Sequence, residues 1–209
     1  MSQAALSIPL SPSERYRQDL DVEGFNYDAS QEQAVERLQA LYDELVCDVE
    51  ADRRPGFMAR IRGRFAKPEP VAPVKGLYFW GGVGRGKTYL MDNFYESLPF
   101  EQKMRAHFHR FMRRVHGELK GLKGEKNPLE KVADRIAADA RVICFDEFFV
   151  SDITDAMLLG SLLEMLFARR VTLVATSNIV QDRLFENGLQ RQRFLPTIAS
   201  LNRHTEVVN

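Results

Sequence analysis

The residues best suited to do chemistry form a glycine-rich run that fits the pattern G-x-x-x-x-G-K-[ST]. Its members are Gly81, Gly82, Val83, Gly84, Arg85, Gly86, Lys87 and Thr88. Glycines let the backbone amides turn inward around a phosphate chain, and a following helix adds the positive end of its dipole. In such a loop the lysine reaches the β- and γ-phosphates and the hydroxyl ligates Mg²⁺. We therefore expect these residues, together with the adjoining Tyr89, to bind a nucleotide.

The neighbouring residues support this interpretation. The apolar stretch 74–80 before the run is typical of a buried strand, and residues 89–95 after it are typical of a helix. A strand, loop and helix in this order is the context in which the pattern holds phosphate, so a chance glycine-rich turn is the less favoured alternative.

A pair of carboxylates follows the second informative strand. Residues 142–145 are apolar, and Asp146 and Glu147 come directly after them. Beside a phosphate loop, Asp146 is placed to hold Mg²⁺ directly or through water. Glu147 is placed to orient and deprotonate the attacking water. The alternative is a strand that ends in a solvated acidic turn.

Other polar residues follow later strands. Asn178 ends the strand 171–176, where its amide would reach the γ-phosphate or the water, unless it only caps the next helix. Arg191 and Arg193 follow a predicted short helix over 181–187. Either arginine suits an arginine finger, and surface salt bridges are an equally good explanation.

Two histidines form a further candidate. His107 and His109 are predicted to face one side of a strand over 106–110. Without a third ligand in view, a structural role or a place near a substrate is favoured over metal binding.

Composition narrows the class of protein. The chain has 209 residues, 44% of them hydrophobic, which suits one α/β domain. Lys and Arg together number 29, as do Asp and Glu, so there is no overall charge that would attract nucleic acid. Two cysteines give no disulfide framework. We find no secretory signal and no apolar run of about 18 residues, so a cytoplasmic protein is expected.

The chain divides into three predicted parts. Residues 1–29 read as a flexible polar arm, and residues 30–73 as an amphipathic helix with a capping box at 30–33 and a basic, proline-rich linker. The basic segment 53–67 is typical of a solvated insertion, with a membrane-surface or acidic-partner contact as the minority interpretation. Over 74–209, strands alternate with helices, which predicts a parallel sheet whose ligands bind at the C-terminal ends of the strands.

These motifs together resemble AAA+ ATPases, and no N-K-x-D motif of a GTPase occurs. A closer resemblance is to the ZapE family of bacterial cell-division ATPases and its mitochondrial AFG-like relatives. It extends over residues 107–112, 144–157 and 187–191. The resemblance implies that Lys87 and Thr88 belong to Walker A, Asp146 and Glu147 to Walker B, and Asn178 to sensor 1. It favours Arg191 over Arg193 as the finger.

The resemblance also implies a function. It is that of a homo-oligomeric ATPase using ATP and Mg²⁺, with the arginine finger supplied in trans. Such a protein associates with the FtsZ ring and destabilises or remodels FtsZ polymers, with peripheral contact at the cytoplasmic face of the inner membrane. Members of this family continue beyond a chain of this length, so their α-helical lid is expected outside these residues. A DNA-associated ATPase of the helicase-loader type and a nucleotide-switched adaptor remain as alternatives.

Overall fold

The structure is a computed structural model that describes residues 9–53, 72–82, 84 and 86–209. Val83, Arg85 and all but the first residue of the basic segment 53–67 lie outside these residues. Five strands form one sheet in which every described pairing is parallel, in the order β2-β3-β4-β1-β5. They are β1 (Gly76–Trp80), β2 (Lys103–His107), β3 (Val142–Asp146), β4 (Thr172–Ser177) and β5 (Thr205–Val208). The predicted parallel α/β sheet is confirmed.

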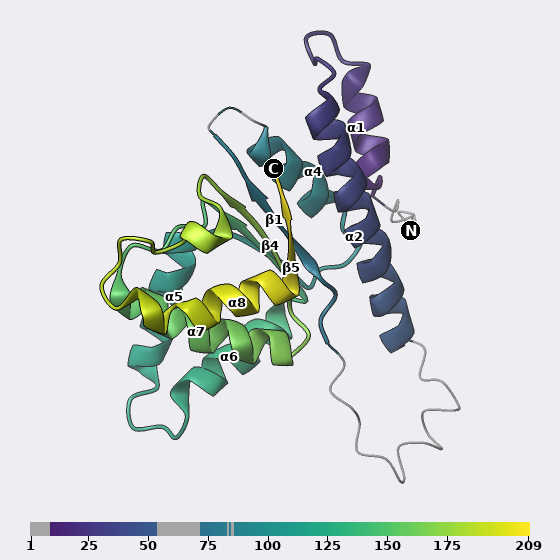
Figure 1. Ribbon diagram of the computed structural model, residues 1–209. Helices are drawn as coiled ribbons and strands as arrows, with labels where there is room; N and C mark the ends of the chain where they lie inside the picture. Colours follow the sequence, from purple (N-terminus) through teal and green to yellow (C-terminus); the bar gives the residue numbers. More distant parts are fainter. Residues whose placement is uncertain (1–8, 54–71, 83, 85) are drawn as a thin grey trace.

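Helices cover both faces of this sheet (Figure 1). On one face lie α1 (Pro12–Leu20), α2 (Ala29–Arg53) and α4 (Lys87–Ser97), and on the other lie α5 (Phe108–Gly121), α6 (Pro128–Asp139), α7 (Ile153–Ala168) and α8 (Leu195–His204). The strands serve both layers because successive side chains point to opposite faces. In β1, Leu77 and Phe79 join the core under α2 and α4, whereas Tyr78 joins the core on the other face.

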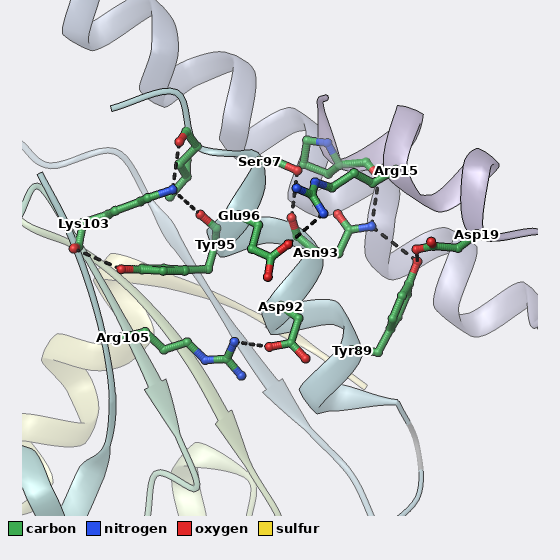
Figure 2. Close-up of polar contacts among 12 residues, drawn as sticks. Arg15, Asp19, Tyr89, Asp92, Asn93, Tyr95, Glu96, Ser97, Lys103 and Arg105 are labelled. Atoms are coloured by element: carbon green, nitrogen blue, oxygen red, sulfur yellow. Dashed lines mark hydrogen bonds and ion pairs between the residues drawn. The ribbon is translucent and has the colours of Figure 1, made fainter. Parts of the chain in front are cut away.

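Helix α1 corrects the expectation of a flexible arm before residue 30. Ser11 and Glu14 form a capping box at its start, and Tyr16 is buried against the rest of the fold. Three contacts tie this helix to α4: Arg15 to Glu96 at 2.8 Å, the Asn93 amide to the Pro12 carbonyl at 3.1 Å, and the Tyr89 hydroxyl to Asp19 (Figure 2). A short polar helix is stable here because tertiary packing supplies what its own sequence does not.

Helix α2 begins one residue before the predicted capping box. Asp28, rather than Ser30, accepts hydrogen bonds from the first backbone amides, those of Ser30 at 2.7 Å and Gln31 at 3.4 Å. Aspartate is as good an acceptor at this position as serine, and the box pattern cannot tell adjacent candidates apart.

Three other segments differ from the predictions. Strand β2 ends at His107, so His109 belongs to the first turn of α5 and not to a strand. The predicted helix over 181–187 is a 3-10 turn, η1 (Gln181–Arg183), and a second one, η2 (Arg191–Arg193), follows. Helix α8 was not predicted, although Pro196 in its first turn and the buried Ile198 and Leu201 carry the signal. Within the described parts of the chain, no helix has the length and apolar character that a membrane crossing requires.

Candidate active site

The glycine-rich loop joins the end of β1 to the start of α4, at the C-terminal edge of the sheet. Gly86 lies just before α4 with φ of 72°, and Gly84 has φ of 83°, values that glycine adopts without strain. The Gly81 amide donates to the Ser177 carbonyl over 3.3 Å, which attaches the loop to the end of β4. The loop is thus held against the end of β4, directly before Asn178.

Lys87 connects these two strand ends. Its Nζ donates to the carbonyls of Gly81 and Gly82, each over 2.7 Å, and to Oδ1 of Asn178 over 3.0 Å. The ammonium group therefore lies within the loop, where a phosphate would be bound. The predicted nearness of Asn178 to the phosphate loop follows from the parallel pairing of β1 with β4.

A cavity of about 840 Å³, named here the central cavity, brings the predicted residues together. Of the predicted site residues it is lined by Gly84, Gly86, Lys87, Thr88, Asp146, Glu147 and Asn178. Tyr89 points elsewhere. Its hydroxyl donates to Asp19 over 2.6 Å (Figure 2), and its ring packs on that of Phe25. Its side chain serves the attachment of α1, and Tyr89 is not among the described residues that line the central cavity.

Glu147 has an unusual backbone conformation. Its φ is 54°, in the left-handed region that residues other than glycine, asparagine and aspartate seldom adopt. The turn is fixed on both sides, since the Glu147 amide donates to Thr176 Oγ1 at 3.4 Å and the Phe148 amide donates to the Thr176 carbonyl at 2.7 Å. These two hydrogen bonds hold Glu147 at the end of β3, where it lines the central cavity.

Arg105 in β2 is a component of the site that sequence reasoning missed. Its Nε donates to Asp146 Oδ2 at 2.8 Å and its Nη2 to Asp146 Oδ1 at 3.3 Å, while Nη1 contacts Asp92 of α4 (Figure 2). Burial acts to lower the pKa of Arg105, but the hydrogen bonds that it donates to the two carboxylates outweigh burial and raise that pKa above its usual range. The sequence does contain a signal for Arg105, because Lys103, Arg105 and His107 alternate as residues on one face of a strand do. The predicted strand begins at residue 106, so it leaves Arg105 out.

The donor set fits a hydrated Mg²⁺ ion. Thr88 offers a hydroxyl and Asp146 a carboxylate on the same cavity, and oxygen ligands with some retained water are what Mg²⁺ prefers. Among the described residues, no cluster of three or more His, Cys, Asp or Glu could hold a metal by itself. A binding site completed by nucleotide phosphates is the arrangement that these side chains support.

The predicted histidines and the candidate arginine finger lie in different parts of the structure, and only His107 of these residues lines the central cavity. His107 and His109 stack with ring centroids 5.9 Å apart, and His107 lines the central cavity at the start of α5. Arg191 lies in η2, where its guanidinium contacts the Asp182 carbonyl, and it is not among the residues that line the cavity. Among the described residues, the predicted finger therefore stands apart from those that line the central cavity of its own chain.

Comparisons with known proteins show the family of this chain. A sequence model described as "AFG1-like ATPase" matches residues 10–209. This chain belongs to the AFG1-like ATPase family. The cell division protein ZapE of Escherichia coli K12 is 55% identical over 203 residues, which cover 96% of this chain and 54% of the relative. An uncharacterized protein of Schizosaccharomyces pombe is 33% identical over 95% of this chain and 49% of its own length.

The AFG1-like chain thus spans about half the length of the curated relatives it matches. Solved structures share its fold at low identity. DnaI matches with a TM-score of 0.57 at 17% identity over 92% of this chain and 94% of that one. AMPPCP-bound DnaA from Aquifex aeolicus matches with a TM-score of 0.56 at 12% identity over 90% and 49%. These likenesses show that the AFG1-like chain shares the α/β fold of these structures.

Proposed function

We propose that this chain is the nucleotide-hydrolysing part of a cell-division ATPase. The observation that carries the proposal is the convergence of Lys87, Asp146, Glu147 and Asn178 on one cavity. Lys87 and the loop amides bind the phosphates of ATP, and Thr88 and Asp146 hold Mg²⁺, which neutralises phosphate charge when bound. Glu147 accepts the proton of the attacking water, and Asn178 orients the γ-phosphate or that water.

An arginine from a second copy completes the proposed site. Arg191 does not line the cavity of its own chain, so its proposed role requires a homo-oligomer in which it stabilises charge on the transferring phosphoryl group. A mixture of Arg191→Ala and Glu147→Gln proteins should then recover activity that each lacks alone. If mixed oligomers form without recovery, the arginine does not act across an interface.

The proposed substrate is a protein polymer. Similarity to a cell division protein, together with the motifs over 144–157, supports remodelling or destabilisation of FtsZ polymers at the division site. This role would place the protein in the cytoplasm, in peripheral contact with the inner membrane. The equal numbers of acidic and basic residues disfavour nucleic acid as the substrate.

Co-sedimentation tests this function. The Glu147→Gln variant, which should hold ATP without hydrolysing it, is mixed with polymerised FtsZ with and without ATP. ATP-dependent co-pelleting is expected, and Lys87→Ala should not pellet. If Glu147→Gln binds ATP but stays in the supernatant, the polymer substrate is wrong. Stimulation of hydrolysis by single-stranded DNA would then favour the helicase-loader class.

A further inference from the structure

Arg105 bonds two carboxylates that come from different layers of the fold. Its fork-shaped guanidinium takes both oxygens of Asp146, at 2.8 Å and 3.3 Å, and its remaining terminal nitrogen contacts Asp92. Figure 2 shows Asp92 directed from α4 toward Arg105. One positive charge is therefore shared between two negative ones, on the wall of the central cavity.

The two carboxylates differ in their access to water. The side chains of Arg105 and Asp146 are 21% and 14% exposed, whereas that of Asp92 is 50% exposed. A half-buried bidentate pair is difficult to break unless another charge replaces the lost partner. Asp92 and the surrounding water can hold the arginine at lower cost once Asp146 is engaged elsewhere.

The fork competes with the proposed metal role of Asp146. A carboxylate that accepts two hydrogen bonds from arginine has fewer lone pairs for Mg²⁺ or its water ligands. The guanidinium and a divalent cation also repel each other at this range. Each partner weakens the other's hold on the carboxylate, so the binding of Mg²⁺ favours a shift of the arginine away from Asp146.

We propose that Arg105 is a positioning residue that shields Asp146 in the nucleotide-free protein and, when Mg²⁺ and ATP enter, releases Asp146 and keeps its contact with Asp92. This inference rests on the metal role of Asp146 in the proposed function. It assigns opposite effects to Arg105 and Asp92. Arg105 raises the Mg²⁺ concentration needed for nucleotide binding, and Asp92 lowers it by holding the arginine once Asp146 is released.

The test measures binding of a fluorescent methylanthraniloyl ATP to the 209-residue chain as free Mg²⁺ is varied. We expect Arg105→Gln to lower the half-saturating Mg²⁺ concentration about tenfold, because a charge-assisted hydrogen-bonded pair no longer has to be broken. Asp92→Asn should raise this concentration several-fold. In the double variant, Asp92→Asn should have no effect, since there is no arginine to hold.

Two controls separate this mechanism from general effects. Arg169→Gln removes an arginine from an ion pair with Asp134, at 2.7 Å, outside the central cavity and should leave the Mg²⁺ requirement unchanged. Arg105→Lys keeps the positive charge without the planar fork and should shift the requirement in the same direction as Arg105→Gln. Circular dichroism establishes that each variant is folded.

Other outcomes overturn the proposal in distinguishable ways. If Arg105→Gln raises the Mg²⁺ requirement, the arginine orients Asp146 for the metal and does not shield it. If Asp92→Asn raises the Mg²⁺ requirement equally with and without Arg105, the charge of Asp92 acts on metal binding directly and not through the arginine. If the wild-type chain binds the nucleotide with no dependence on Mg²⁺, the metal role of Asp146 fails together with this inference. If it binds no nucleotide, the proposed function itself is wrong.

Discussion

Lys87 Nζ lies 3.0 Å from Asn178 Oδ1, although 91 residues separate the two in the chain. The contact joins the phosphate loop to the end of β4, because β1 and β4 are neighbours in the sheet. In the proposed function, a phosphate that replaced the loop carbonyls around Lys87 would lie beside Asn178. The two residues nevertheless have different proposed tasks, binding for the lysine and orientation for the amide.

Replacing these two residues should therefore have different consequences. Lys87→Ala is expected to abolish ATP binding, because the positive charge at the β- and γ-phosphates is lost. Asn178→Ala should keep the dissociation constant within a few-fold and lower the hydrolysis rate about tenfold or more. Equilibrium binding and steady-state phosphate release measure the two effects. Asn202→Ala, which removes a surface contact with Asp182, is the matched control.

Replacing Glu147 should separate hydrolysis from binding. Glu147→Gln removes the proposed general base, and we expect hydrolysis to fall about 10²- to 10⁴-fold while ATP binding persists. Single-turnover phosphate release and equilibrium binding measure this difference. Glu164→Gln, at an exposed position of α7, should leave both quantities unchanged. Hydrolysis by Glu147→Gln at the wild-type rate would assign the base to another residue.

The C-terminal end of α2 should contribute pH-dependent stability. Burial acts to raise the pKa of Asp52, but hydrogen bonds from Arg141 and Arg170 outweigh it, so the pKa is lowered. A lowered carboxyl pKa stabilises the fold above the unfolded-state value of about 3.9 and loses this effect as the pH falls through the folded value. Asp52→Asn should therefore destabilise the protein at pH 7, and its difference from wild type should shrink below about pH 4.

Urea unfolding at a series of pH values measures this difference. Asp43→Asn is the matched control on the same helix, where the carboxylate accepts only from Gln39 in the described contacts. If the loss of unfolding free energy in Asp52→Asn stays constant down to pH 2, the assigned ion pairs of Asp52 are wrong.

The attachment of α1 depends on the hydroxyl of Tyr89. Burial first, and then the hydrogen bond to Asp19, raise the pKa of Tyr89, so the phenol stays protonated and donates to Asp19 at neutral pH. Tyr89→Phe should cost about 1 kcal/mol of unfolding free energy, because a partly buried carboxylate loses its donor. Thermal or urea unfolding measures it, with Tyr42→Phe in α2 as a control expected to change little. An equal loss in both variants would mean that the hydroxyl of Tyr89 has no special part.

The amino-acid sequence alone determined the main components of this protein. Glycines at fixed spacing before Lys87 and Thr88, and an apolar run before Asp146 and Glu147, predict their positions because each pattern depends on local backbone conformation and strand burial. Alternating strands and helices predict a parallel sheet, since its crossovers require helices on the faces. From that sheet alone, Asn178 was expected beside the phosphate loop.

Only the tertiary structure decided which side chains meet. Arg105 pairs with Asp146 because β2 lies beside β3, and with Asp92 because α4 packs on the same face, relationships that no local pattern contains. Helix α1 is ordered because α4 and α2 bury Tyr16, and the same contacts turn Tyr89 away from the central cavity. Strand order and helix packing depend on the free energy of the whole core, so these contacts follow from the complete fold.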